Sequence, residues 1–102
     1  MSRRMENDKG GARENNSKHM KLVLIEWLDS HSGRGWQDME AVEHAAVPLY
    51  CRSVGWLARE TKDCKVIVPH ISGEKNGNSV LQGCGDLTIP TAAIEKITVL
   101  RR

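Results

Sequence analysis

The sequence predicts a mainly β fold, a small open or closed β-barrel of about five strands with one short helix or helical turn. Short runs rich in Val, Ile and Leu alternate with polar turn segments, which is typical of strands. The 102 residues include three Trp, one Tyr and no Phe, so the core must be aliphatic. Gly55 interrupts the longest run, and short strands with a glycine bend can curl into a barrel that removes exposed edges.

The first nineteen residues differ in composition from the rest. Residues 1–19 hold few side chains to bury and contain Gly10-Gly11 and Asn15-Asn16, so we predict a disordered leader. Residues 20–102 are predicted to form a single small β-barrel domain. The leader carries five basic and three acidic side chains and the domain ten of each, so the net charge of +2 belongs to the leader. A neutral domain leaves nucleic-acid binding possible but does not favour it.

The first apolar segment, residues 21–28, is predicted as a strand. Its alternate side chains are apolar on both faces, with Leu22, Leu24 and Leu28 on one and Val23, Ile25 and Trp27 on the other. Such a strand is covered on both sides or uses one face at an interface. Because the core is also small, we expect a homo-oligomer held by strand edges or by the face of Val23, Ile25 and Trp27.

The segments that follow are predicted in chain order. Residues 29–35 form a polar loop, and residues 36–46 a short helix or single turn that ends before Pro48. Residues 49–60 form a long strand in which Gly55 marks a bulge or bend. A tight turn then leads into a hairpin partner at residues 64–71, where Pro69 removes one ladder donor.

The C-terminal third is predicted to hold two shorter strands. Residues 72–83 form a polar loop and residues 84–90 a short strand closed by Pro90. Residues 91–94 form one helical turn, and residues 95–100 the final strand. No apolar run has the roughly 20 residues of a membrane span, and the leader lacks the apolar region of a signal peptide, so we expect a cytoplasmic protein.

The cysteines are Cys51, Cys64 and Cys84, an odd number without a close pair. We predict buried thiols in a reducing compartment. With His70 they could supply a zinc site, but structural zinc sites use close pairs, so no metal is predicted. The sets Asp29, Ser30, His31 and His70, Cys84, Asp86 form no recognisable catalytic signature, so we expect neither catalytic residues nor a cofactor.

Two resemblances bear on the fold and the origin of the chain. The stretch from Gly55 to Leu100 resembles Sm-like small β-barrels through Gly55-Trp56-Leu57, Val66-Ile67-Val68, Ile89-Pro90, Ala93-Ile94 and Ile97. That resemblance implies a small RNA- or DNA-binding module. Four further segments are similar to small uncharacterised proteins encoded by bacteriophages: residues 26–30, 51–56, 69–70 and 82–86. They imply a phage origin, and so the cytoplasm of an infected bacterial host.

A binding pocket is predicted where three loops would meet at a barrel rim. The candidate ligand-binding residues are polar, aromatic or glycine: Asp29, Ser30, Trp36, His70, Gln82, Gly83, Gly85 and Asp86. Each of them alone also has an ordinary reading as a cap, a turn former or a solvated side chain. We therefore predict a non-enzymatic phage accessory protein that binds a host protein or a small nucleotide-type ligand, with a counter-defence role. The alternative is the Sm-like RNA- or DNA-binding module.

Overall fold

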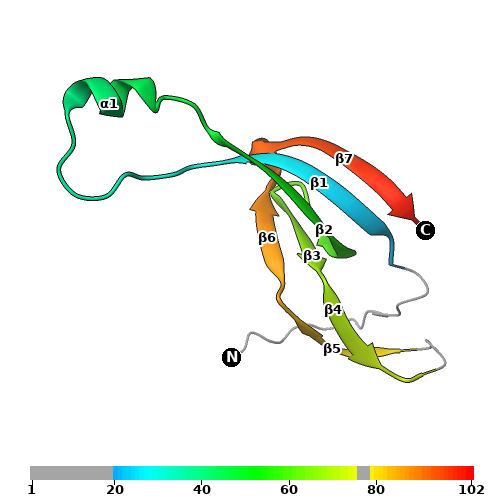
Figure 1. Ribbon diagram of the computed structural model, residues 1–102. Coiled ribbons are helices and arrows are strands. Elements are labelled where there is room, and N and C mark those ends of the chain that lie inside the picture. The colour runs from blue at the N-terminus through cyan, green and yellow to red at the C-terminus, as the bar shows by residue number, and fades with distance from the viewer. Residues whose placement is uncertain (1–19, 76–78) are drawn as a thin grey trace.

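The computed structural model describes residues 20–75 and 79–102, so the predicted disorder of the leader lies outside the described residues. The described chain contains seven strands, one α-helix and one turn of 3-10 helix (Figure 1). Their bounds are β1 Leu22–Asp29, α1 Met39–His44, β2 Leu49–Glu60, β3 Cys64–Val68, β4 His70–Gly73, β5 Val80–Cys84, β6 Leu87–Pro90, η3 Thr91–Ala93 and β7 Ile94–Arg101. The prediction of a mainly β protein is confirmed.

Five strands form one antiparallel sheet in the order β6-β3-β2-β1-β7, and β4 pairs with β5 in a separate hairpin. The long strand β2 pairs with β1 from Leu49 to Trp56 and with β3 from Trp56 to Glu60. The exchange of partners occurs next to Gly55, and the ladder irregularity lies between Leu57 and Arg59. The region predicted to bend is therefore the corner of the sheet.

The sheet curls but does not close. Its two edge strands, β6 and β7, are joined only by the three residues of η3, which span about 10 Å at most. The Thr91 N–H donates a hydrogen bond to the Asp63 carbonyl oxygen at 2.8 Å, which fixes η3 against the β2–β3 turn. Among the described residues no ladder joins β6 to β7, so the sheet is open.

The concave side of the sheet holds the core. Val23, Ile25, Ile67 and Ile89 are almost fully buried there, and six further apolar side chains pack against them, among them Trp27 and Ile97. The Trp27 Nε1–H donates to Ser53 Oγ at 3.1 Å. One predicted oligomer interface is therefore wrong, because the face of Val23, Ile25 and Trp27 is the core itself.

Three predicted boundaries change in the hairpin region. The strand predicted at residues 64–71 breaks at Pro69 into β3 and β4, and the strand predicted at residues 84–90 is reduced to β6. The loop predicted at residues 72–83 contains the end of β4 and most of β5. β4 has the sequence HISG and β5 the sequence VLQGC, and neither shows a repeated alternation of apolar and polar residues. Their strand conformation therefore depends on their pairing with each other.

The connection between β1 and β2 leaves the sheet altogether. Figure 1 shows α1 and its flanking chain extending away from the strands. We call residues 30–48 the arm. The helix is shorter than the predicted range of residues 36–46 and buries none of its residues. In the described ranges no helix is both long and apolar enough to cross a membrane.

Candidate functional site

The arm is held together by hydrogen bonds among its own residues. Near its base, His31 Nε2 donates to the Val47 carbonyl oxygen at 2.6 Å, so two segments sixteen residues apart are tied together. The N–H of Val42 donates to Asp38, and the N–H of Ala45 to Val42, which forms the single helical stretch. The arm also borders an open hollow of about 550 Å³ lined by His31, Ser32, Gly33, Gln37, Ala41, Val42 and Ala45.

Apolar side chains of the arm and its junction with β2 face solvent. Every residue from Ser30 to Tyr50 is exposed. Trp36 is fully exposed, Met39 is 65% exposed and Val47 67% exposed. Leu49 and Tyr50, at the start of β2, are each about half exposed. Several large apolar side chains exposed within one segment are typical of an interaction surface.

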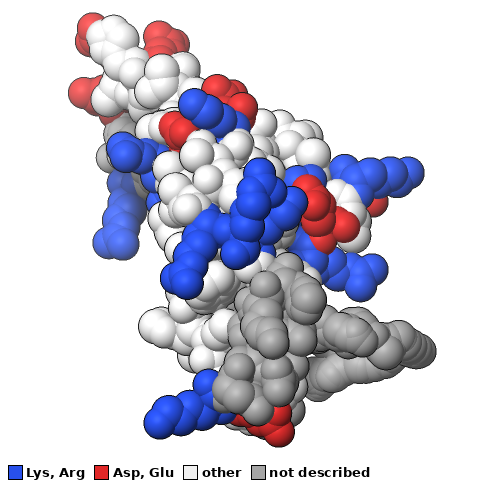
Figure 2. Space-filling view, turned by 90° about the vertical axis from the view of Figure 1, so that its right-hand side faces the viewer, with Lys and Arg blue, Asp and Glu red and all other residues white. Residues whose placement is uncertain are grey.

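The arm and the sheet carry opposite charge. The arm holds one basic side chain, Arg34, against Asp38, Glu40 and Glu43, which is a net charge of −2. The rest of the described chain holds nine basic and seven acidic side chains, a net charge of +2. Figure 2 shows Asp and Glu at the end of the molecule where α1 lies, and Lys and Arg over the sheet. The net charge of zero for residues 20–102 is therefore the sum of an acidic arm and a basic remainder.

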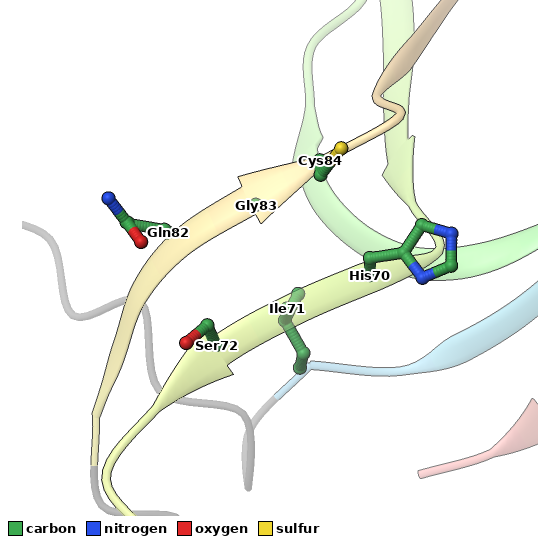
Figure 3. A pocket seen from close by; sticks show the side chains of 6 residues that line it. All are labelled: His70, Ile71, Ser72, Gln82, Gly83 and Cys84. Carbon is green, nitrogen blue, oxygen red and sulfur yellow. The ribbon is translucent and has the colours of Figure 1, made fainter.

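A second candidate surface lies on the β4–β5 hairpin. A hollow of about 500 Å³ is lined by three residues of each strand: His70, Ile71, Ser72, Gln82, Gly83 and Cys84 (Figure 3). His70 lies opposite Cys84 in the ladder and Ser72 opposite Gln82. All six except Ile71 are exposed, so the hollow is an open depression with imidazole, hydroxyl and amide groups at its rim.

The glycines beside this depression have structural reasons of their own. A Cβ on Gly83 would lie 3.0 Å from Val68 Cγ1, so the glycine lets β5 pack closely on β3. Gly85 has a φ of +81°, and a Cβ there would lie 3.2 Å from Pro69 Cγ. Gly83 therefore serves the packing of β5, and Gly85 makes the turn that leads from β5 into β6.

The predicted site residues fall into two groups. His70, Gln82 and Gly83 line the β4–β5 depression, and Gly85 and Asp86 follow β5 directly. Asp29 ends β1, Ser30 begins the arm and Trp36 precedes α1, at the opposite end of the molecule in Figure 1. The structure therefore does not gather all eight residues around one rim, because the loops leave the curled sheet at different ends.

The remaining sequence candidates lie apart from one another. Cys51 and Cys64 are partly buried, whereas Cys84 is exposed, so the prediction of a buried thiol is wrong at Cys84. It lies on the outer hairpin and not on a core strand. Within residues 20–75 and 79–102, no three His, Cys, Asp or Glu side chains approach closely enough to hold a metal ion.

The outer face of β1 carries one polar contact that the sequence did not indicate. The Tyr50 hydroxyl donates a hydrogen bond to a carboxylate oxygen of Glu26, which lies opposite Arg52 on β2 and Lys96 on β7. This hydrogen bond, with desolvation and the negative charge of Glu26, raises the pKa of Tyr50 above its ordinary value of 10.0. The contact fixes the side chain of Tyr50 next to the arm.

Comparisons with protein-family models, with curated proteins and with solved structures find no match. The candidate surfaces therefore rest on the geometry of this chain alone.

Proposed function

We propose that this protein acts by binding and that its arm docks onto another protein. The observation that carries the proposal is that every residue from 30 to 50 is exposed, including the apolar Trp36, Met39 and Val47. A folded segment that contributes nothing to its own core, yet presents large apolar side chains, is stabilised when a partner removes them from water. Trp and Tyr are also the side chains that most often dominate protein–protein affinity.

The charge of the arm defines the chemistry of the partner. Asp38 lies at the start of α1, and Glu40 and Glu43 lie within it, whereas Arg34 is the one Lys or Arg of the arm. The surface that fits is an apolar groove bordered by Lys and Arg, since opposite charges guide association and like charges oppose it. The resemblance to bacteriophage proteins makes a host protein the partner we propose, in the cytoplasm of an infected bacterium and in a counter-defence role.

The proposal is tested by crosslinking and then by affinity. A photo-crosslinking amino acid at Met39 is expected to capture a host protein, whereas the same probe at Lys75 on the β4–β5 turn is the control. The captured protein is then purified and its affinity measured by calorimetry. Trp36→Ala should weaken it about 30-fold, as for an interface hot spot of about 2 kcal/mol. Unchanged affinity in Trp36→Ala and Met39→Ala variants would contradict docking by the arm.

A small nucleotide-type ligand is the second candidate, favoured by the depression on β4 and β5. The side chains of His70, Ser72 and Gln82 offer hydrogen bonds to a base or ribose, and Ile71 offers an apolar contact. Titration with nucleoside mono- and diphosphates tests it directly. Binding lost in His70→Ala and Gln82→Ala but retained in Trp36→Ala would assign the ligand to this depression.

The Sm-like RNA- or DNA-binding module stays a prediction, supported by the Lys and Arg over the sheet in Figure 2. The salt dependence of binding distinguishes this module from the protein-binding function. Affinity for an oligonucleotide that falls steeply with salt concentration would support this module, because phosphate contacts release counterions.

A further inference from the structure

The two edges of the open sheet differ in how well they are protected from pairing. β6 has four residues and ends at Pro90, which has no N–H to donate. β7 has eight residues, IEKITVLR, and contains no proline. Within the described chain β7 pairs only with β1, so the backbone groups along its other side form an unpaired edge.

The residues of β7 make its free edge suited to pairing with another strand. Ile97, Thr98 and Val99 are β-branched, and the ladder of β7 with β1 is regular from Lys96 to Val99. Beyond this stretch the ladder is irregular, because Glu95 and Leu100 have no partner on β1. Val99 is 38% exposed and Leu100 50% exposed, so β7 also offers apolar surface that a second strand could cover. Proteins normally cover a long edge of this kind or use it for pairing.

We propose that β7 pairs antiparallel with β7 of a second copy of this chain, with the two-fold axis at Thr98. In this register Glu95 lies opposite Arg101 of the second copy, and by symmetry Arg101 lies opposite its Glu95. Ile97 lies opposite Val99, and the two Thr98 residues face each other. Opposite charges, β-branched pairs and Thr–Thr pairs are each favourable across an antiparallel ladder.

Neighbouring registers match the charges less well, although a shift by one residue still places Glu95 opposite a basic side chain, Arg102. A shift by one residue in one direction places Lys96 opposite Arg101, and in the other direction it places Glu95 opposite Leu100. A shift by two residues places Lys96 opposite Arg102 or Glu95 opposite Val99. Like charges directly opposite one another are destabilising, so the register centred on Thr98 is favoured. The pairing would extend two five-stranded sheets into one, with closed two-fold symmetry.

The charge pairs allow a test within the intact chain. Sedimentation equilibrium of the wild type is expected to show a dimer at micromolar to high micromolar concentration. Glu95→Arg and Arg101→Glu each place like charges opposite one another twice, and each should raise the dimer dissociation constant about tenfold. The double variant Glu95→Arg/Arg101→Glu restores both pairs and should dimerise like the wild type. An equimolar mixture of the two single variants should form a heterodimer for the same reason.

Matched controls are Glu74→Arg and Lys75→Glu. They make the same two kinds of charge reversal at the β4–β5 turn, away from β7, and should leave the dimer dissociation constant unchanged. Glu95 and Arg101 are exposed, and thermal melting checks that each variant is folded. A monomeric wild type at high micromolar concentration would overturn the proposal, as would a double variant no tighter than the single ones. Neither result would contradict the proposal that the arm docks onto another protein, because Trp36 and Met39 lie outside β7.

Discussion

Gly55→Ala tests how tightly the corner of the sheet is packed. A Cβ built on Gly55 lies 3.1 Å from Ile67 Cβ, 3.1 Å from the Val68 backbone nitrogen and 3.2 Å from the Val68 carbonyl carbon. Carbon atoms in ordinary contact are about 3.5–4.0 Å apart, so β3 would have to move by a few tenths of an ångström. The atoms in the way are backbone and a Cβ, which cannot rotate out of the path.

Two effects of opposite sign decide the outcome of Gly55→Ala. The loss of a glycine reduces the entropy of the unfolded chain and stabilises a protein by about 0.4–1 kcal/mol. Overpacking a core costs about 1–3 kcal/mol. We therefore expect a net loss of about 1–2 kcal/mol in the free energy of unfolding, or about 4–8 °C in Tm for each kcal/mol in a domain of this size.

Urea unfolding followed by Trp fluorescence measures that loss. Gly83→Ala is the comparison, because its Cβ would meet a methyl of the Val68 side chain instead of backbone, and we expect a smaller loss, below about 1 kcal/mol. A Gly55→Ala variant as stable as the wild type would show that β2 and β3 have room at the corner. The close packing we assign to the bend would then be wrong.

Three further predictions concern other parts of the chain. Glu26→Ala should lower the pKa of Tyr50 toward its ordinary value, measured by the absorbance of the one tyrosine in the chain, and an unchanged midpoint would contradict the hydrogen bond. Because the folded pKa is raised, this contribution to stability is present below pH 10 and is lost as the pH rises through the folded pKa. Ser53→Ala removes the acceptor of Trp27 Nε1–H and should cost about 1 kcal/mol in urea unfolding, against a negligible effect of Ser72→Ala on the exposed hairpin. Deletion of residues 1–19 should leave Tm nearly unchanged, because that segment has few side chains to bury, and a drop of several degrees would refute this.

The strands that the sequence predicts well are those whose own side chains form the core. β1, β2 and β7 lie within one or two residues of the predicted ranges, because Val23, Ile25 and Ile97 alternate with outward-facing residues. The sequence does not predict β5, since its two aliphatic residues, Val80 and Leu81, are adjacent rather than alternating and its strand conformation depends on pairing with β4. Local pattern therefore identifies core strands and fails where only a partner strand specifies the structure.

The binding residues were harder to predict than the strands, because a site depends on where loops go. The sequence singled out Trp36 and His70 as candidate binding residues, and both are exposed, but the prediction of one pocket assumed that their loops meet. An apolar spacing such as Met39 and Val42 normally indicates a helix face that packs on a core. Here α1 stands away from the sheet, and no property of residues 36–46 alone reveals that.

Edge pairing and arm docking together fix the arrangement of arms in the assembly. The first residue of β7, Ile94, lies opposite Trp27 of β1. Trp27 is two residues before Asp29, where β1 ends and the arm follows. Antiparallel pairing about Thr98 places the two Ile94 residues on opposite sides of the two-fold axis, about 26 Å apart along the strands at 3.3 Å per residue. The arms then leave from opposite ends, so they cannot close on one compact partner. Each dimer should bind two partner molecules independently, and native mass spectrometry of the complex measures this ratio. A complex of one partner per dimer, with both arms required, would contradict the combination of edge pairing and arm docking.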